Sequence, residues 1–414
     1  MSGGARRVAV VHDWLTGMRG GEKVLEAICT LFPAADLFTL VRVPGSVSPS
    51  IESHPIRVSA LRWVPGARRF YRQLLPLFPA LVESFDLDRY DLVISSSHCA
   101  VKSVTRPGRA VHVCYCHSPM RYGWDQFNAY FGKAQVGPVR HALLRRMLAG
   151  LARWDAATAG RVDAYVANSQ YVATRIGRYY NRGSTVVYPP VDTEFYRLSD
   201  DRVRRTPARA GSGGRPSASF LMVSALVPYK QVQVAIAACR KVGAALKIVG
   251  KGPELPRLQQ MAGSAVQFLG WRSDEEVRTL YQEATAVLLP GIEDFGMVPV
   301  EAQACGCPVV ALGQGGAIET VVDGQTGVLV RDASVESFAE GLQRVTELQF
   351  DPAAIRTQAL RFSRDRFLTE FRTVVDRTLH SASPQDGHPR GYQPPSLPQG
   401  VNEREYRPPS RTNK

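Results

Sequence analysis

Stretches with strand character alternate with helical stretches along most of this chain, and this alternation limits the possible folds more than any other feature. In the first half the expected helices cover residues 22–31, 140–159 and 170–180, and the expected strands cover residues 7–11, 35–40, 90–95, 110–116, 162–167 and 185–188. In the second half we expect strands at residues 220–223, 246–249, 266–269, 286–289, 308–311 and 328–330. A capping box formed by Ser273 and Glu276 predicts a helix that runs to residue 284. Strands separated by helices indicate βαβ units, and therefore parallel sheets.

The alternation is interrupted once, by a segment at residues 199–217 that is rich in Gly, Pro and charged residues and therefore predicts a linker. We expect an α/β fold of two Rossmann-like doubly wound domains, at residues 1–198 and 218–360. A C-terminal helix at 361–380 and a disordered tail at 381–414 follow. Ligands of doubly wound sheets bind outside the carboxyl ends of the strands, so the active site is expected in a central cleft that both domains face.

Two glutamates, Glu293 and Glu301, flank a glycine-containing turn between an expected buried strand and an apolar helix. Such a strand–loop–helix unit presents free backbone N–H groups and the positive end of a helix dipole, which favour an anion such as a phosphate. The two carboxylates add acceptors for hydroxyl groups. A sugar nucleotide carries both phosphates and hydroxyls and satisfies both halves. The residues of the turn and helix start that would bind it are Phe295, Gly296, Met297 and Val298.

The phrase EDFGMVPVEAQACG at residues 293–306 resembles the signature of the retaining glycosyltransferases of family 4, in which seven residues separate two glutamates. The resemblance extends from about residue 8 to about residue 382 and includes several separate blocks. It implies the GT-B fold and transfer of a sugar from a nucleotide diphosphate with retention of anomeric configuration. It also implies that no metal or other cofactor is required, because helix N-termini and a lysine take the place of a cation.

Two further blocks supply the remaining residues that the resemblance makes catalytic. His117 ends an expected strand and opens an HSP block, and the histidine of the family's H-[ST]-P block contacts the donor sugar near the reacting centre. Lys230 ends the block VSALVPYK and resembles the family lysine that neutralises the diphosphate leaving group. Charge develops on that group in the transition state, so this cation would be catalytic as well as binding. Glu293 would hold donor-sugar hydroxyls and Glu301 the ribose hydroxyls.

Two glycine turns complete the predicted binding residues. Gly20 and Gly21 lie between the first strand and the first helix, where the lack of a Cβ lets the backbone approach a phosphate. Gly250 and Lys251 follow another strand and resemble the family loop that lies against the nucleotide base. This second turn lacks the third glycine of a dinucleotide fingerprint, which weakens a nicotinamide oxidoreductase as an alternative.

The chain departs from the family pattern at Ala225, because many relatives have an arginine five residues before the lysine that shares the phosphate contact. Arg19 or Lys251 are two possible substitutes. The missing cation also leaves open a catalytically silent protein that binds sugar nucleotides or serves as a scaffold.

The VSALVPYK block and the phrase around Glu293 resemble the subgroup associated with GDP-mannose and with surface polysaccharide or lipopolysaccharide assembly. The sequence therefore favours a hexosyltransferase that moves mannose from GDP-mannose to a glycan or glycolipid acceptor. A UDP-hexose donor is the closest alternative.

Several features concern location and metals. The chain has no apolar run long enough for a transmembrane helix and no apolar signal region after Met1, which predicts a cytoplasmic protein. Its seven cysteines include two C-x-C pairs without matching histidines, so we expect buried reduced thiols rather than disulfides or zinc ligands. Asp86 and Asp88 match a D-x-D metal pattern of another glycosyltransferase fold, but they are far in sequence from the phosphate elements, and no metal is predicted there.

The net charge of +14 is unevenly distributed, since residues 1–199 contain 25 Lys+Arg and 14 Asp+Glu, whereas residues 200–360 contain 16 and 17. An excess confined to one half indicates a surface that faces something anionic. No nucleic-acid-binding motif accompanies this charge, so nucleic acid is not an expected partner.

Two arginine-rich helical segments in the first half, at residues 62–78 and 140–154, combine arginines with bulky apolar residues. This composition is typical of a helix that lies on anionic lipid, which predicts association with the inner face of the membrane. The alternative is a core-packing face opposite a solvated cationic face, and it predicts that Trp63, Phe70 and Tyr71 are buried.

Overall fold

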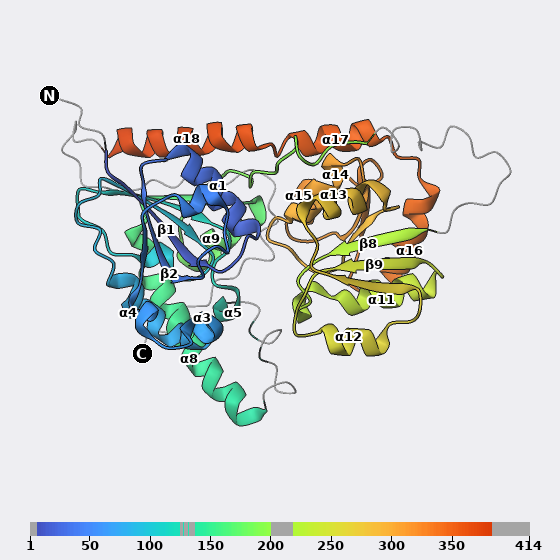
Figure 1. The fold of residues 1–414 in the computed structure, drawn as a ribbon, viewed down its shortest axis with the longest axis horizontal. Coiled ribbons are helices and arrows are strands. Elements are labelled where there is room, and N and C mark those ends of the chain that lie inside the picture. The colour runs from blue at the N-terminus through green and yellow to red at the C-terminus, as the bar shows by residue number, and fades with distance from the viewer. Residues whose placement is uncertain (1–5, 125–126, 128–130, 132–136, 200–217, 383–414) are drawn as a thin grey trace, which may run out of the picture. The chain divides into compact units, whose positions relative to one another are not determined.

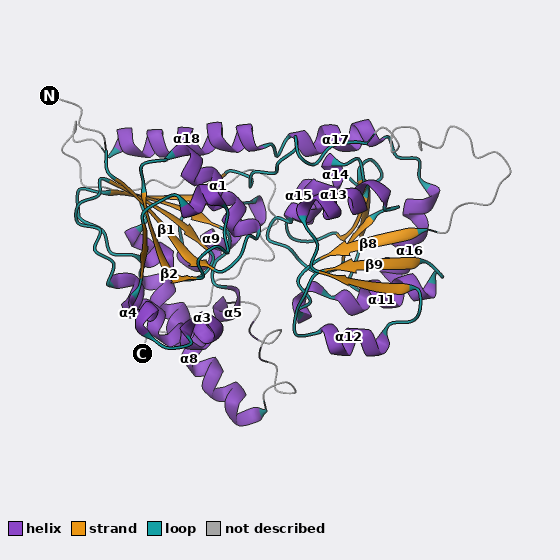
Figure 2. Cartoon of the chain, in the orientation of Figure 1, coloured by secondary structure: helices purple, strands orange, loops and turns teal. Residues whose placement is uncertain are grey.

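The computed structural model of the chain describes residues 6–124, 127, 131, 137–199 and 218–382 (Figure 1). The predicted linker and tail lie outside the described residues, apart from Ser199, Ser381 and Ala382. Within the described part, every named strand belongs to one of two sheets, and helices separate most consecutive strands (Figure 2).

The first sheet has seven parallel strands in the order β3-β2-β1-β4-β5-β6-β7. The order reverses between β1 and β4, and open α/β sheets bind ligands outside the carboxyl ends of strands at such a point. One strand, β3, was not expected, and β1 continues to Leu15 instead of ending at Val11. The strands are β1 Val8–Leu15, β2 Asp36–Arg42, β3 Ile56–Val58, β4 Leu92–Ser97, β5 Val111–Cys116, β6 Ala164–Ala167 and β7 Ser184–Val186.

Both faces of this sheet are covered, as the doubly wound fold requires. Successive residues of a strand point to opposite faces. Val10 accordingly packs in one core with Leu25 of α1, whereas Val11 packs in another with Phe78 of α4 and Leu148 of α8. Burial on both faces explains why these strands are nearly continuous apolar runs.

The helices of the first domain follow the predicted order, and α9 begins at Ser169, whose hydroxyl accepts the N–H of Val172 at 3.0 Å. The segment expected as one helix at residues 62–78 is instead four short pieces. Gly66, with φ +76, precedes one of them, and Pro76 lies inside another. The elements are α1 Gly20–Leu31, α2 Pro49–Glu52, η1 Ala60–Trp63, α3 Ala67–Phe70, η2 Tyr71–Leu77, α4 Phe78–Glu83, η3 Val101–Ser103, α5 Arg121–Trp124, α8 Pro138–Ala157, η4 Ala159–Arg161 and α9 Gln170–Tyr180.

The second sheet has six parallel strands in the order β10-β9-β8-β11-β12-β13, so its order reverses between β8 and β11. All six strands were predicted. Phe220 packs with Phe338 on one face, and the next residue, Leu221, packs with Tyr281 on the other. The strands are β8 Ser219–Val223, β9 Ala245–Val249, β10 Val266–Gly270, β11 Val287–Leu289, β12 Val309–Leu312 and β13 Gly327–Val330.

The helices of the second domain cover both faces of its sheet. The predicted capping box is confirmed, since Ser273 accepts the N–H of Glu276 and the Glu276 carboxylate accepts the N–H of Ser273 at the start of α13. The elements are η5 Pro228–Lys230, α11 Val232–Lys241, α12 Leu255–Met261, α13 Asp274–Glu283, α14 Met297–Ala304, α15 Ala317–Thr320, α16 Val335–Glu347 and α17 Pro352–Leu360.

The polypeptide passes between the two sheets' cores more than once. Val191 and Tyr196, which follow β7, are buried in a core of the second sheet. The last helix, α18 (Arg364–Ser381), packs Phe367 and Phe371 against Tyr115 of β5 in a core of the first sheet. The C-terminal helix thus completes the first domain.

All seven cysteines are buried and free, as expected for reduced thiols. None of the helices that the structure describes is long and apolar enough to span a bilayer.

Candidate active site

Lys230 and Glu293 meet at the point where the strand order of the second sheet reverses. Lys230 follows β8 in η5, Glu293 follows β11, and the Lys230 ammonium donates to Oε1 of the carboxylate. The two loops pack tightly, because a Cβ on Gly291 would lie 2.5 Å from the carbonyl oxygen of Tyr229. Burial lowers the pKa of Lys230, but the Glu293 charge outweighs it, so the pKa is raised and the ammonium stays charged. The structure brings two of the three predicted catalytic residues into direct contact.

Glu301 lies in α14 and is 6% exposed. Its carboxylate accepts hydrogen bonds on both oxygens, from the Tyr281 hydroxyl at 3.1 Å and from the Lys23 ammonium at 3.0 Å. Lys23 belongs to α1 of the first domain, and Asp274 lies 3.6 Å from the same ammonium. The carboxylate predicted to hold ribose hydroxyls is therefore oriented by one residue from each domain.

His117 follows β5 and is the third predicted catalytic residue. Its Nε2 lies 2.8 Å from Oγ of Ser96, and the same hydroxyl lies 3.0 Å from Nδ1 of His12. The rings of His12, His98 and His117 pack against one another with centroids 5.8 to 6.3 Å apart. Burial and the two neighbouring imidazoles hold the pKa of His117 well below its ordinary value, so the ring is neutral.

Sequence reasoning missed His12, Ser96 and His98. His12 is completely buried within β1, past the residue where that strand was expected to end, and Ser96 lies in β4. The apolar Trp14 and Leu15 beyond His12 are the signal that the strand continues.

The first turn of α1 connects His117 with the start of α14. The helix begins at Gly20, two residues before the expected start, so both glycines lie inside its first turn. A Cβ on Gly21 would lie 3.9 Å from Nε2 of His117, and a Cβ on Gly20 would lie 3.1 Å from Sδ of Met297. The positive end of this helix therefore lies beside predicted site residues of both domains.

Asp294, next to Glu293, binds two arginines of the first domain. Arg121 donates to Oδ2 of Asp294 through Nε at 2.8 Å, and Arg175 donates to Oδ1 at 3.0 Å. The Ser169 hydroxyl also donates to the Asp294 carbonyl at 2.6 Å. Arg175 donates in addition to Oγ of Ser118, the residue after His117, at 2.7 Å. This network, which sequence reasoning did not find, links the His117 strand end to the Glu293 loop.

The other predicted binding residues fall into two groups. In the 295–298 turn, Phe295 packs against Tyr188 and Phe362 and is 3% exposed, so only its backbone could contact a ligand, whereas Met297 and Val298 are partly exposed. In the other turn a Cβ on Gly250 would lie 1.9 Å from the carbonyl oxygen of Ser224. Packing of two loops thus accounts for that glycine, and the neighbouring Lys251 is exposed.

No group of His, Cys, Asp and Glu among the described residues could hold a metal ion. Asp86 and Asp88 are exposed and lie before β4, at the end of the sheet opposite His117. The Asp86 carboxylate accepts the N–H of Asp88 at 3.2 Å, which is a local turn contact.

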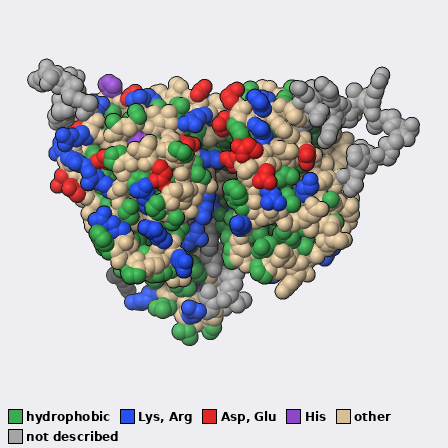
Figure 3. All heavy atoms as spheres, viewed as in Figure 1, with side chains coloured by type: hydrophobic (Ala, Val, Ile, Leu, Met, Phe, Trp, Pro, Cys, Tyr) green, Lys and Arg blue, Asp and Glu red, His purple; other side chains and the backbone are tan. Residues whose placement is uncertain are grey.

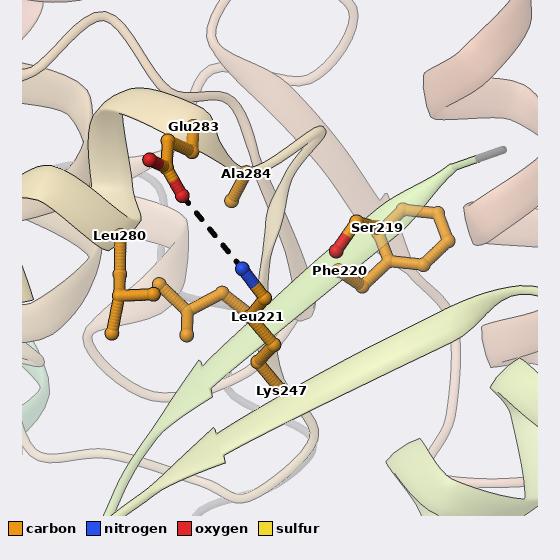
Figure 4. A pocket seen from close by; sticks show the side chains of 7 residues that line it. All are labelled: Ser219, Phe220, Leu221, Lys247, Leu280, Glu283 and Ala284. Atoms are coloured by element: carbon orange, nitrogen blue, oxygen red, sulfur yellow. Dashed lines mark ion pairs between the residues drawn. The ribbon is translucent and has the colours of Figure 1, made fainter. Parts of the chain in front are cut away.

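A pocket of about 240 Å³ lies away from these residues, at the amino ends of β8 and β9 (Figure 4). Lys247 and Glu283 form an ion pair across it at 3.7 Å. The predicted site residues follow the carboxyl ends of the strands, so this pocket is not part of the candidate site.

Two family models match the chain. Glycosyltransferase Family 4 matches residues 18–195, and Glycosyl transferases group 1 matches residues 214–361. Together the two matches span more than three quarters of the 414 residues.

Curated relatives share part of the sequence. The GDP-mannose-dependent alpha-(1-6)-phosphatidylinositol monomannoside mannosyltransferase of Mycolicibacterium smegmatis is 33% identical over 204 residues, which are 44% of this chain and 52% of that protein. D-inositol 3-phosphate glycosyltransferase of Mycobacterium leprae is 33% identical over 181 residues, which are 41% of this chain and 42% of that protein. The chain spans about half the length of the curated relatives it matches.

Solved structures resemble nearly the whole chain. Anabaena HepE in complex with UDP has a TM-score of 0.65 at 22% identity, and the similarity covers 91% of this chain and 100% of that chain. Sucrose-phosphate synthase from Thermosynechococcus elongatus has a TM-score of 0.62 at 19% identity, with 91% of this chain and 100% of that chain covered. With the two parallel sheets, these similarities confirm the predicted GT-B fold. Both domains of the chain therefore match glycosyltransferase family models, and the model that matches the first domain is Glycosyltransferase Family 4.

Proposed function

We propose that this protein is a retaining glycosyltransferase that moves a hexose from a nucleotide diphosphate to a hydroxyl of a glycan or lipid-linked acceptor. One observation supports this proposal more strongly than any other. The Lys230–Glu293 pair lies at the strand-order reversal of the second sheet, where doubly wound folds bind nucleotides. A bound donor offers phosphate oxygens to the ammonium and sugar hydroxyls to the carboxylate, so it replaces one contact with two.

The other site residues have complementary roles. Glu301, held by Tyr281 and Lys23, accepts hydrogen bonds from ribose hydroxyls, as carboxylates do in dinucleotide-binding folds. The N–H groups at the start of α1 and α14 face the phosphates, where helix N-termini stabilise negative charge. His117 contacts the donor sugar. The bond between C1 and the diphosphate breaks, a bond from C1 to the acceptor oxygen forms on the same face, and the acceptor proton leaves with the phosphate.

Arg121 supplies the second cation that Ala225 cannot. The Arg121 Cζ and the Lys230 Nζ each lie 5.2 Å from the centre of the Tyr229 ring, so both positive charges lie near this one side chain. The neighbouring Asp294 carboxylate more than offsets the cost of burying the guanidinium and raises its pKa. When Arg121 turns to a phosphate, Arg175 remains bound to Asp294. The substitutes suggested by the sequence, Arg19 and Lys251, are both exposed.

Mannose from GDP-mannose is the first choice of donor, in the synthesis of surface polysaccharide or lipopolysaccharide. The VSALVPYK block supports it, as does the GDP-mannose-dependent relative from Mycolicibacterium. A UDP-hexose is the second candidate, because a protein of the same fold, Anabaena HepE, was crystallised in complex with UDP-glucose.

A thermal-shift panel tests the donor. A ligand at 100 times its Kd raises the unfolding free energy by about 2.7 kcal/mol. GDP-mannose should therefore raise the melting temperature more than UDP-glucose, UDP-galactose, UDP-N-acetylglucosamine or NAD. Donor hydrolysis without acceptor then separates an enzyme from a silent binding or scaffold protein, because only the enzyme releases GDP. Absence of both stabilisation and hydrolysis with every sugar nucleotide would contradict the proposal.

The first domain carries a surface suited to a lipid-linked acceptor. Trp63 and Val64 are 74% and 39% exposed in one arginine-rich segment, and Leu143 is 67% exposed in the other, with Val139 just before it 80% exposed. The arginines of both segments are exposed, namely Arg62, Arg68, Arg69, Arg72, Arg140, Arg145, Arg146 and Arg153. Figure 3 shows Lys and Arg side chains interspersed with hydrophobic ones in the region where Figure 1 labels α3 and α8. Exposed apolar residues among cations fit an anionic bilayer.

The core-packing alternative is correct for part of these segments. Tyr71 is 6% exposed and packs against Trp14, and Phe70 is partly buried. Of the three aromatic residues expected to add an apolar contribution to lipid binding if exposed, Trp63 alone is exposed, so the proposed contact relies on Trp63 and the α8 residues.

A further inference from the structure

A chain of polar contacts runs beneath His117 in the first domain. Nε2 of His117 lies 2.8 Å from the Ser96 hydroxyl, which lies 3.0 Å from Nδ1 of His12. Nε2 of His12 in turn lies 3.8 Å from a carboxylate oxygen of Glu22. A serine hydroxyl has one proton, so Ser96 donates to one imidazole and accepts from the other. The proton positions along the chain therefore depend on one another.

Glu22 determines the direction of this chain. Its other carboxylate oxygen accepts the N–H of Arg19 at 3.1 Å. Burial raises the pKa of Glu22, but the contact with His12 and further interactions outweigh it and leave the pKa below its ordinary value. A carboxylate accepts but cannot donate, so it favours a proton on the His12 nitrogen that faces it, Nε2. An imidazole with its proton on Nε2 accepts through Nδ1, so in this tautomer of His12 the Ser96 hydroxyl donates to Nδ1 and accepts from Nε2–H of His117.

The first turn of α1 and a third imidazole enclose this chain of contacts. His12 is completely buried, and a Cβ on Gly21 would lie 3.7 Å from its Cε1, so the first turn of α1 packs against this ring. His98, the third ring of the group, also has a lowered pKa, because its burial outweighs the attraction of Asp13.

We infer that Glu22, acting through His12 and Ser96, holds His117 in the tautomer with its proton on Nε2, which leaves Nδ1 as a hydrogen-bond acceptor. No hydrogen bond to this Nδ1 occurs among the described residues. The consequence for the donor, which rests on the proposed function, is a preference for a sugar that presents a hydroxyl to His117. A bare ring nitrogen accepts from a hydroxyl and repels the carboxylate of a uronic acid. Glu22, His12 and Ser96 are positioning residues.

Nitrogen NMR of the ¹⁵N-histidine-labelled full chain reads the tautomer directly, without any donor. At about pH 8, above the ordinary imidazole pKa of about 6.5, the two nitrogens of a neutral ring give separate protonated and bare signals. The His117 signals are assigned from their loss in His117→Gln. We expect a protonated Nε2 and a bare Nδ1. A protonated Nδ1 in the wild-type chain would overturn the inference.

Glu22→Gln tests the direction of the chain. The amide oxygen still accepts the N–H of Arg19, while the amide N–H₂ now donates to Nε2 of His12. Every donor and acceptor along the chain then reverses, and the proton of His117 moves to Nδ1. Ser96→Ala disconnects the two rings and leaves His117 with mixed tautomers. An unchanged His117 tautomer in Glu22→Gln would contradict the inference.

Ser95→Ala is the matched control. Ser95 is the neighbouring serine of the same strand, and its hydroxyl lies 2.8 Å from Nε2 of a different histidine, His112. This variant should leave the His117 signals unchanged.

Kinetics separate the inference from the proposed function. With the donor that wild type uses, Glu22→Gln should lower kcat/KM about tenfold, the usual size of one lost hydrogen bond. The affinity for the nucleoside diphosphate, which has no sugar to face His117, should stay unchanged. If wild type turns over no sugar nucleotide, the proposed function fails while the NMR result still decides the tautomer.

Discussion

The ammonium of Lys23 lies 3.0 Å from Oε1 of Glu301, across 278 positions of sequence. Burial acts against the charge of Lys23, but Glu301 and Asp274 outweigh it and raise its pKa. A ribose that binds Glu301 must therefore share this carboxylate with a cation from the other domain. In the proposed site, this contact would tie nucleotide binding at Glu301 to the position of α1 in the first domain.

Glu301→Gln should weaken binding of the nucleoside diphosphate by about tenfold or more, because hydrogen bonds to a charged group contribute about 1.5–3 kcal/mol. The kcat at saturating donor should change little. Titration calorimetry gives the affinity and initial rates give kcat. Glu336→Gln, at an exposed carboxylate paired with Lys241 at 3.3 Å, is the control. An unchanged nucleotide affinity in Glu301→Gln would remove Glu301 from the ribose site.

Glu293→Gln should have the opposite effect, since this carboxylate is assigned to the donor sugar. We expect a lower kcat with nearly unchanged affinity for the nucleoside diphosphate. Wild-type kinetics in both glutamate variants would show that the assigned site is wrong.

Lys230→Ala should cost about 3 kcal/mol of transition-state stabilisation, the size typical for one preorganised electrostatic contact. The measurement is kcat/KM with the preferred donor. Lys241→Ala, at an exposed lysine of the same domain, should be unaffected. A Lys230→Ala enzyme with unaltered turnover would place the phosphate contact elsewhere.

Arg121→Gln tests the second cation. Loss of this charge should lower kcat/KM by about tenfold or more, since a charge-assisted hydrogen bond is lost. Arg121→Gln combined with Ala225→Arg restores a guanidinium at the family position and should recover part of the rate. If both variants melt normally but the double variant recovers none of the lost rate, we would conclude that Arg121 acts only by holding Asp294.

Membrane binding through the first domain should require anionic lipid and weaken with salt. Each basic residue near such a bilayer contributes about 1 kcal/mol, within a Debye length of the surface. Liposome co-sedimentation measures it, and Trp63→Ala should reduce the bound fraction. Trp271→Ala is the control, because Trp271 is also exposed, at 68%, but belongs to the second domain. Equal pelleting with neutral and anionic vesicles, or none, would end the idea.

The folded chain should lose stability in mild acid through His112. Burial lowers the pKa of His112 to about 3. Below about pH 6.5 the unfolded chain takes up a proton there that the folded chain does not, so the unfolding free energy falls by about 2 kcal/mol between pH 6.5 and 5 from this group alone. Urea unfolding at the two pH values measures the slope. His112→Gln should make it shallower, and an equal slope in both proteins would contradict the assignment.

Most of the fold could be predicted because parallel strands buried on both faces are continuous apolar runs. The strand β3 was not predicted because it has only three residues and its central residue is the charged Arg57. The end of β1 was placed too early because His12 and Asp13 are polar. Both are completely buried, and Asp13 accepts the N–H groups of residues 98 to 101 in place of water.

The site was predictable only where one short stretch of sequence contains it. Glu293 and Glu301 belong to one phrase, and His117 and Lys230 each end a strand. The contacts of Asp294 with Arg121 and Arg175 join positions 173 and 119 apart, and no local pattern relates them. Ser96 likewise could not be recognised from local sequence, because the histidine that its hydroxyl contacts, His12, is 84 positions away.

The packing of α18 also affects how the chain can fold while it is being synthesised. Phe367, Phe371 and Val375 fill a core whose other members include Val10 and Leu25, near the start of the chain. The first domain therefore cannot close this core when its own strands leave the ribosome, and it waits for nearly all of the second domain to be made. During that interval an apolar face of the nascent chain stays exposed, and surface of this kind is what chaperones shield during synthesis. A single cut of the gene between the two sheets would therefore leave the first sheet without the helix that completes its core.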